Sequence, residues 1–247
     1  MLNEPTTEKL HRLRLVAMAH AWIEQNKNPT IASLSFDERF GMLVDAEHMA
    51  RDNRRLGKLL KDAQLRLPTA CIEDVEASAA RGLEKATLRQ LGSCTWIHEH
   101  LNVVLTGKTG VGKSYLACAL GQIACRKGYR VLYRRVPRLL DELALARAEG
   151  SSVKLLARLA KTDVLVLDDW GLASLKEGHR HDLLEVIEDR YGRVSTVITS
   201  QLPLAKWHEW IGDPTIADAI LDRLVHNAYK IDLTGHTRRK TEPTKAD

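Results

Sequence analysis

Residues 101–114 read LNVVLTGKTGVGKS, an apolar run that leads into a loop rich in glycine. The run predicts a buried β-strand, and the segment 115–127, closed by Gly128, predicts a helix directly after the loop. The loop, from Gly107 to Ser114, has the pattern G-x-x-x-x-G-K-S between a strand and a helix. Glycine suits these positions because a Cβ would hinder backbone N–H groups from turning inward onto phosphate oxygens. The stretch therefore predicts an α/β fold whose first loop binds phosphates.

This loop pattern also predicts how a nucleoside triphosphate and its metal ion are held. Lys113 should reach the β- and γ-phosphates of ATP, and the Ser114 hydroxyl should ligate Mg²⁺. A glycine-rich turn without a ligand is the alternative, but strand, loop, helix and closing glycine all agree with the phosphate-binding interpretation. The other predicted nucleotide contacts are Gly107, Lys108, Thr109, Gly110, Val111, Gly112 and Tyr115.

A second apolar run, residues 164–167, ends in the carboxylates of Asp168 and Asp169. Ligands of open α/β sheets bind at the carboxyl edge of the strands, where this pair should lie. Asp168 is predicted to hold Mg²⁺, commonly through water, because this hard ion prefers oxygen ligands. Asp169 is predicted to orient or deprotonate the attacking water. The alternative for the pair is an ordinary turn at the end of a strand.

Two later segments supply further candidates for catalysis. Ser200 and Gln201 follow a predicted strand at 194–199 and could contact the γ-phosphate or the water, as could Thr199. A polar strand end that begins a loop is the competing interpretation for each of them. Arg223, on a predicted helix, could act as an arginine finger on the phosphate of a neighbouring subunit. A salt bridge to Asp218 or Asp222 is the alternative for that arginine.

The texture of the sequence divides the chain near residues 95 and 96. Residues 1–95 repeat apolar side chains every three or four positions and predict a small all-helical domain. Within it, the capping box Ser35 to Glu38 predicts the start of a long helix that runs through Leu60. Residues 96–247 alternate short apolar runs with amphipathic segments, which predicts a parallel sheet covered by helices. Its five strands are expected at 101–106, 130–133, 164–167, 194–199 and 229–233.

Composition limits the classes of partner. The 37 Lys and Arg residues exceed the 32 Asp and Glu residues by a net charge of +5, which allows a polyanion partner without requiring one. No apolar stretch approaches the roughly 18 residues of a membrane span, and the first residues lack the order of a signal peptide. We therefore expect a cytoplasmic protein without a membrane partner. The four cysteines lack the spacing of a zinc site and are expected to be buried.

Two basic groups are candidate contacts to the phosphates of DNA. The first lies at the end of the long N-terminal helix, where positions 51, 54, 55 and 58 share one face and Arg66 follows. The second comes directly after the second predicted strand. Such a stripe supplies affinity with little sequence choice, although a solvated helical face is its more usual role. The predicted contacts are Arg51, Arg54, Arg55, Lys58, Lys61, Arg134, Arg135 and Arg138.

The motifs quoted above, with the segments 36–40, 199–203 and 212–224, resemble those of IstB-like proteins. These are AAA+ ATPases that assist the transposase of an insertion sequence and are related to DnaC-type helicase loaders. The resemblance implies a P-loop NTPase core of the AAA+ type that hydrolyses ATP, forms a homo-oligomer on double-stranded DNA and delivers this DNA to the transposase of the same insertion sequence. It also implies that Asp169 occupies the position of the usual catalytic Glu, Gln201 or a neighbour that of sensor 1, and Arg223 that of the arginine finger. Because Asp is one methylene shorter than Glu, we expect slow or partner-stimulated hydrolysis.

The end of the chain departs from the general AAA+ pattern. Only 14 residues follow Leu233, too few for the helical lid domain that most AAA+ proteins carry, so we expect no such lid. Whether Arg238 or Arg239 contacts nucleotide is left open. The alternative function is a helicase loader that uses ATP as a switch; a small-molecule kinase would need an acceptor pocket that no segment supplies. Subunit number, target-site preference, hydrolysis rate and the identity of the transposase are also left open.

Overall fold

The computed structural model describes residues 3–237 and divides the chain into two compact units, Met1–Lys58 and Leu59–Asp247. This division does not fall at residues 95 and 96, where the change of sequence texture predicts a domain boundary. The segment 59–95 instead makes its contacts within the second unit; for example, the Cys71 backbone N–H donates to the Tyr115 hydroxyl at 3.3 Å. Helical texture is the same whether a helix packs on a sheet or stands apart, so the pattern could not reveal this attachment.

The first unit is helical. It contains α1 (Asn3–Arg12), α2 (Val16–Lys27), the 3₁₀ turn η1 (Pro29–Ser33) and most of α3 (Phe36–Ala63). The predicted capping box is confirmed at the start of α3, because Glu38 accepts from the Ser35 backbone and hydroxyl, both at 2.8 Å. Further along α3, the buried Glu47 carboxylate accepts from the backbone N–H groups of Ala17 and Met18 at the start of α2. This carboxylate complements the positive end of the α2 helix.

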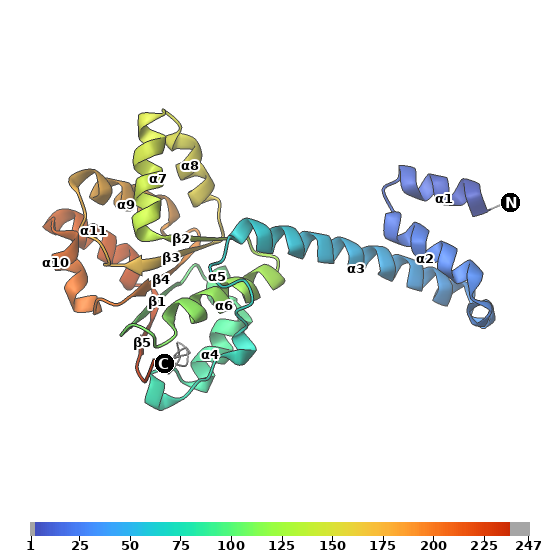
Figure 1. Ribbon diagram of the computed structural model, residues 1–247, viewed down its shortest axis with the longest axis horizontal. Helices are drawn as coiled ribbons and strands as arrows, with labels where there is room; N and C mark the ends of the chain where they lie inside the picture. The colour runs from blue at the N-terminus through green and yellow to red at the C-terminus, as the bar shows by residue number, and fades with distance from the viewer. Residues whose placement is uncertain (1–2, 238–247) are drawn as a thin grey trace, which may run out of the picture. The chain divides into compact units, whose positions relative to one another are not determined.

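The second unit is built on five parallel strands, β1 (Asn102–Gly107), β2 (Val131–Arg135), β3 (Val164–Trp170), β4 (Ser195–Ser200) and β5 (Ala228–Leu233) (Figure 1). Their order across the sheet is β2-β3-β4-β1-β5. The predicted five-stranded parallel sheet is thus confirmed, and each strand lies within a few residues of its expected position. Because all strands are parallel, their carboxyl ends meet at one edge; Arg135 pairs in register with Asp168, for example.

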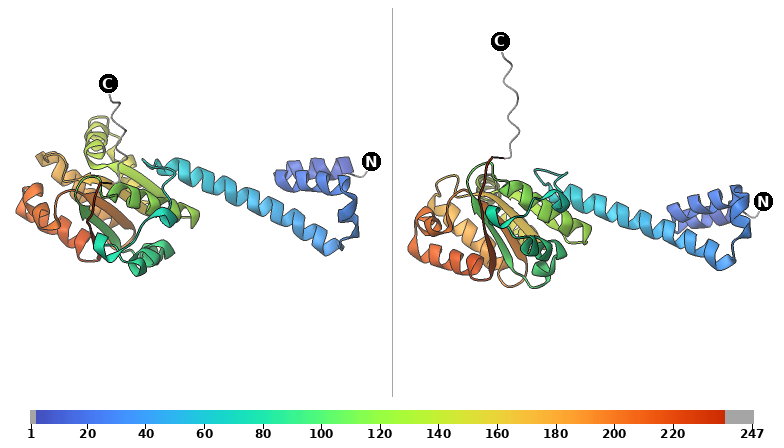
Figure 2. Two further views of the ribbon diagram at one scale, coloured as in Figure 1. Left: turned by 60° about the horizontal axis from the view of Figure 1, so that its bottom comes forward. Right: turned by 90° about the horizontal axis from the view of Figure 1, so that it is seen from below.

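Helices cover both faces of the sheet (Figure 2). One group shares a single apolar core with β1, β2, β3 and β4: α7 (Val136–Ala148), α8 (Ser152–Ala160), α9 (Glu177–Arg190), α10 (Trp207–Ile211) and α11 (Pro214–Val225). On the other side lie α6 (Lys113–Arg126) and α4 (Lys85–Ser93). The short elements are α5 (Thr95–His98), η2 (Ile72–Asp74), η3 (Ala79–Arg81) and η4 (Leu204–Lys206).

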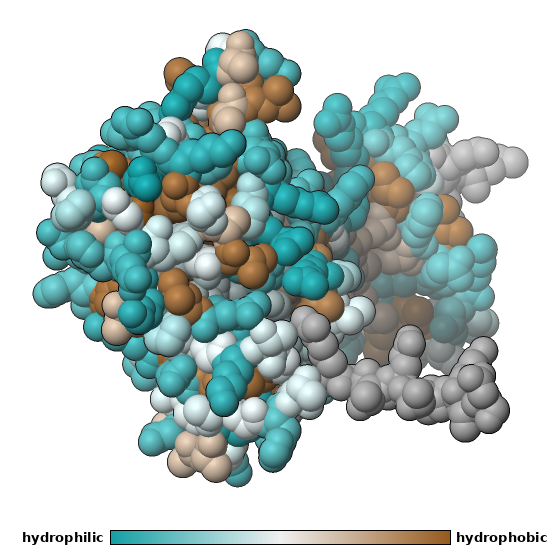
Figure 3. All heavy atoms as spheres, turned by 60° about the vertical axis from the view of Figure 1, so that its left-hand side comes forward, coloured by the Kyte–Doolittle hydropathy of each residue, from teal (hydrophilic) through white to brown (hydrophobic). Residues whose placement is uncertain are grey.

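The surface of the protein carries both hydrophilic and apolar side chains. Hydrophilic side chains cover much of the face drawn in Figure 3, with apolar residues in separate small patches. Between residues 3 and 237, no helix combines the length and the apolar character that crossing a bilayer requires. Three of the four cysteines, Cys94, Cys118 and Cys125, are buried as expected, whereas Cys71 is partly exposed.

Candidate nucleotide-binding site

The phosphate-binding loop connects the end of β1 to the start of α6. Its glycines have positive φ angles, 137° at Gly107, 88° at Gly110 and 101° at Gly112, which residues with a Cβ rarely adopt. Space also requires glycine at the first position, because a Cβ on Gly107 would lie 2.1 Å from the Leu233 carbonyl oxygen. The loop therefore opens directly onto the N-terminal end of α6, where backbone N–H groups favour anions.

Lys113, the first residue of α6, is folded over the loop. Its ammonium group donates to the carbonyl oxygens of Gly107 at 2.7 Å and Lys108 at 2.8 Å. The side chain is largely buried but still lines the cavity described below. These two bonds hold a positive charge against the loop and beside the cavity, as a phosphate site requires.

Asp168 is fully buried at the carboxyl end of β3 and accepts polar contacts on both oxygens. Its Oδ1 accepts from the Ser114 hydroxyl at 2.9 Å and from the Thr199 hydroxyl. Its Oδ2 accepts from the Tyr133 hydroxyl and lies 3.6 Å from Arg66 Nη1. Burial, followed by the hydrogen bond to Asp168, raises the pKa of Tyr133, so this phenol remains a donor. The adjacent oxygens of Ser114 and Asp168 are the hard donors that Mg²⁺ prefers, so these two residues fit the ion.

Asp169 follows with a positive φ of 62°, at a point where the register between β3 and β4 shifts. Successive side chains of a regular strand point to opposite faces, and this irregularity lets both carboxylates serve the same region. The Asp169 carboxylate lines the cavity and accepts from Arg135 Nε at 2.6 Å. Its backbone N–H donates to the Thr199 hydroxyl at 3.3 Å.

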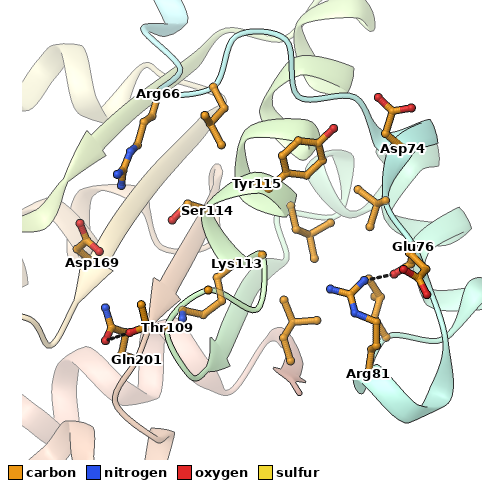
Figure 4. A pocket seen from close by; sticks show the side chains of 17 residues that line it. Arg66, Asp74, Glu76, Arg81, Thr109, Lys113, Ser114, Tyr115, Asp169 and Gln201 are labelled. Carbon is orange, nitrogen blue, oxygen red and sulfur yellow. Dashed lines mark hydrogen bonds between the residues drawn. The ribbon is translucent and has the colours of Figure 1, made fainter. Parts of the chain in front are cut away.

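A cavity of about 500 Å³ lies beside the loop (Figure 4). One wall comes from the phosphate-binding loop and α6, and the other from the chain between Arg66 and Leu83 together with Leu233. Arg81 joins the two walls, because its Nη2 donates to the Val111 carbonyl oxygen at 2.9 Å. The apolar part of the lining suits a nucleotide base: it comprises Leu67, Val75, Leu83, Tyr115, Leu116 and Leu233. No motif or spacing in the sequence ties the wall 66–83 to the loop, so this wall was not predictable.

Of the two catalytic residues predicted at the end of β4, Gln201 lines the cavity and Ser200 does not. Gln201 lines the cavity, and its Oε1 accepts from the Thr109 hydroxyl at 2.6 Å. Ser200 is buried and donates its hydroxyl hydrogen to the Trp170 carbonyl oxygen at 2.7 Å. The same hydroxyl accepts from the Leu202 backbone N–H at 3.0 Å. Ser200 therefore ties the strand end to its neighbours, and its side chain is not part of the cavity lining.

Arg223 does not line this cavity. Its Nη2 forms an ion pair with Glu188 at 2.9 Å, and its guanidinium lies 5.8 Å from the centre of the Tyr191 ring. The carboxylate partner is thus Glu188, not Asp218 or Asp222 as the sequence suggested. Arg238 and Arg239 lie outside the described residues.

Several of the basic residues expected to contact DNA already have acidic or amide partners within the chain: Arg51 and Arg54 pair with Glu47, Arg134 with Glu142 and Gln64, and Arg135 with Asp169. To meet a phosphate, these residues would have to exchange their partners. Arg55, Lys58, Lys61 and Arg138 are exposed on α3 or α7.

Comparison with known proteins agrees with this geometry. The family model described as IstB-like ATP binding protein matches residues 8–246. The insertion sequence ATP-binding protein y4pL of Sinorhizobium fredii (strain NBRC 101917 / NGR234) is 50% identical over 246 residues and 100% of both chains. The ATP-binding protein of insertion sequence IS1162 from Pseudomonas fluorescens is 52% identical over 203 residues, which cover 82% of this chain and 88% of the relative.

Solved structures show the same fold. DnaI superimposes with a TM-score of 0.58 and 23% identity over 74% of this chain and 93% of its own. The DnaC helicase loader superimposes with a TM-score of 0.55 and 23% identity, over 67% of this chain and 97% of its own. AMPPCP-bound DnaA from Aquifex aeolicus superimposes with a TM-score of 0.57 and 17% identity, over 69% of this chain and 51% of its own. The fold is therefore that of a P-loop NTPase, shared with these helicase loaders and DnaA, and the chain belongs to the family of IstB-like ATP-binding proteins.

Proposed function

We propose that the protein assembles on double-stranded DNA when it binds ATP and delivers this DNA to the transposase of its insertion sequence. The observation that carries the proposal is a phosphate-binding site within a chain that resembles, along its whole length, a relative named as an insertion sequence ATP-binding protein. Hydrolysis of ATP would then reset the assembly. Binding to duplex DNA, homo-oligomerisation and the transposase partner are all parts of this proposal.

Within the cavity, we assign the hydrolytic role to Asp169, whose carboxylate lines the cavity beside the phosphate-binding loop. A carboxylate there can orient or deprotonate the attacking water. Ser114 and Asp168 would hold Mg²⁺, which supplies charge stabilisation to the phosphates when bound. The bond from Thr109 keeps Gln201 at the cavity, which favours Gln201 as the sensor of the terminal phosphate. The Ser200 hydroxyl is engaged by Trp170, so we assign Ser200 a supporting role only.

Arg135 offers a physical link between DNA and hydrolysis. It is both a proposed DNA contact and the ion-pair partner of Asp169, and its side chain is 38% exposed. While the pair holds, the Asp169 carboxylate is only partly available to a water molecule. A DNA phosphate that drew Arg135 away would release this carboxylate, which accounts for the expected slow and partner-stimulated hydrolysis.

Arg223 would act on a neighbouring subunit. Its guanidinium pairs with Glu188 and lies outside the cavity of its own chain, so any contact with a γ-phosphate has to be made across an interface. An arginine supplied in this way stabilises the charge that develops on the transferred phosphoryl group. This role makes hydrolysis depend on assembly.

The proposal is tested by electron microscopy with duplex DNA, with and without a non-hydrolysable ATP analogue. Rings or helices should form only when both ligands are present. Lys113→Ala should abolish this assembly, because it removes the ammonium group that the phosphates need. Arg158→Ala, which truncates an exposed arginine of α8, is the matched control and should assemble normally.

Two results would contradict the proposal. Assembly on DNA without nucleotide would separate DNA binding from the ATP site. A strong preference for single-stranded over duplex DNA, with a stable complex to a replicative helicase, would favour the helicase-loader function instead.

A further inference from the structure

Arg66 lines the cavity, although in the sequence it follows the basic residues at the end of the long helix. It follows the last residue of α3, Ala63, by three positions, in the loop that leads to η2. Figure 4 shows its guanidinium directed into the cavity, toward the region between Ser114 and Asp169. Among the residues that line the cavity, it thus lies beside the groups that would hold the terminal phosphate.

Arg66 interacts with both Tyr133 and Asp168. Its Nη1 lies 3.6 Å from Asp168 Oδ2, an oxygen that already accepts from the Tyr133 hydroxyl. The Arg66 side chain is 49% exposed, so much of the guanidinium faces solvent and the cavity. Burial opposes its charge, but Tyr133 and Asp168 outweigh this effect and raise the pKa of Arg66. Its guanidinium is therefore a half-exposed cation at the edge of the site.

The cavity is also lined by two other cationic side chains, Lys113 and Arg81, which lie farther from the acidic residues of β3. Lys113 is fixed over the loop by two carbonyl oxygens, so it serves the phosphates nearest the loop. Arg81 is joined to the Glu76 and Val111 carbonyl oxygens, and Figure 4 shows it on the far side of the cavity from Asp169. Of these three side chains, Arg66 is the one beside the two acidic residues of β3.

We propose that Arg66 leaves Asp168 when ATP binds and donates to the terminal phosphate, as a catalytic residue supplied by the same chain. A guanidinium presents parallel N–H groups that match two phosphate oxygens, a stronger contact than the present one. Mg²⁺ held by Ser114 and Asp168 would weaken the attraction of Arg66 to that carboxylate, because like charges repel. The assignment rests on the ATP site of the proposed function and is independent of DNA delivery.

The terminal phosphate distinguishes ATP from ADP, so Arg66 should discriminate between them. With ADP, the guanidinium lacks its new partner and stays with Asp168.

The test is a titration of wild-type protein and variants with fluorescent analogues of ATP and ADP in the presence of Mg²⁺. Arg66→Ala should weaken ATP binding roughly 10-fold, the loss expected for a charge-assisted phosphate contact, and leave ADP affinity unchanged. The ATP affinity of Arg66→Lys should lie between those of wild-type protein and Arg66→Ala, because lysine keeps the charge but loses the planar pair of donors. Arg158→Ala is the matched control, and thermal unfolding of each variant checks its fold.

An equal loss of ATP and ADP affinity in Arg66→Ala would identify a purely structural residue and overturn the assignment. Unchanged or tighter ATP binding would do the same, the latter because it would show that Arg66 competes with the nucleotide. Wild-type protein that bound neither nucleotide would instead remove the proposed function itself. The failure of the ATP site and the failure of the Arg66 assignment therefore give different results.

Discussion

Asp169 is held in a conformation that the chain would not adopt without support. A non-glycine residue at φ 62° is strained, and such strain persists only where the surroundings maintain it. Here Arg135 holds the carboxylate and Thr199 holds the backbone N–H. The position of this acid is therefore set by three elements together, β2, β3 and β4.

Asp169→Asn tests the hydrolytic role, since asparagine tolerates a positive φ and keeps the shape while removing the charge. Phosphate release should fall roughly 100-fold or more, the usual contribution of a general base, with ATP binding unchanged. Asp189→Asn, an exposed residue of α9, is the matched control. Undiminished turnover in Asp169→Asn would assign the water to another group.

Arg135→Gln removes the cation that engages Asp169. Basal hydrolysis should rise, and stimulation by duplex DNA should shrink, because the carboxylate is already released. Phosphate release measured with and without DNA gives both quantities. A fall in basal hydrolysis would mean that Arg135 positions Asp169 for catalysis instead of restraining it.

The turn at Gly82, after η3, is the element that brings the cavity wall against β5. Gly82 has a φ of 71°, and a Cβ there would lie 2.0 Å from the Asp232 carbonyl oxygen. Gly82→Ala should therefore lower the free energy of unfolding by more than about 3 kcal/mol, from strain and overlap together. Gly192→Ala has a similar φ of 66° but no atom within 4 Å, and should cost about 1 kcal/mol. Chemical denaturation of both variants would show the difference, and equal losses would contradict the packing described.

Helix α6 carries two buried thiols that tie stability to pH. Burial raises the pKa of Cys118 to about 11 and that of Cys125 to about 12, from the ordinary value of 9.0. The unfolded chain thus releases these protons before the folded chain does, so stability present below pH 9 is lost as pH rises toward 12. Each thiol adds a slope of up to about 1.4 kcal/mol per pH unit. Denaturation at several alkaline pH values should show a shallower loss for Cys125→Ala than for wild-type protein or for Cys71→Ala; parallel curves would refute this.

The elements differed in how far sequence could predict them. The loop from Gly107 to Ser114 is continuous, and its glycines and lysine each answer a requirement of phosphate binding, so position and chemistry were both predictable. The strands were predictable because their apolar runs are buried on both faces. The wall 66–83 was not, because it reaches the loop only through tertiary contacts such as Arg81 to Val111. Ser200 and Gln201 are adjacent in sequence, and only backbone geometry decides which side chain reaches the cavity.

At the scale of the whole molecule, the proposed assembly predicts complementation between inactive variants. Asp169→Asn keeps its arginine finger and Arg223→Ala keeps its carboxylate, so a mixture can form active sites at their shared interfaces. A 1:1 mixture with random head-to-tail neighbours should recover roughly a quarter of wild-type hydrolysis, measured by phosphate release. No recovery on mixing would place Arg223 outside the active site of a neighbour.

Hydrogen bonds join the chain before β1 to the chain after β5, and they matter for the design of shorter fragments. The Thr234 backbone N–H and hydroxyl donate to the carbonyl oxygens of Arg81 and Ala80, so this turn shields one outer strand of the sheet. A shortened polypeptide beginning at residue 96 would keep the nucleotide-binding motifs but leave that edge strand exposed, which favours edge-to-edge aggregation. The shortest fragment that folds on its own should therefore begin well before the nucleotide-binding motifs.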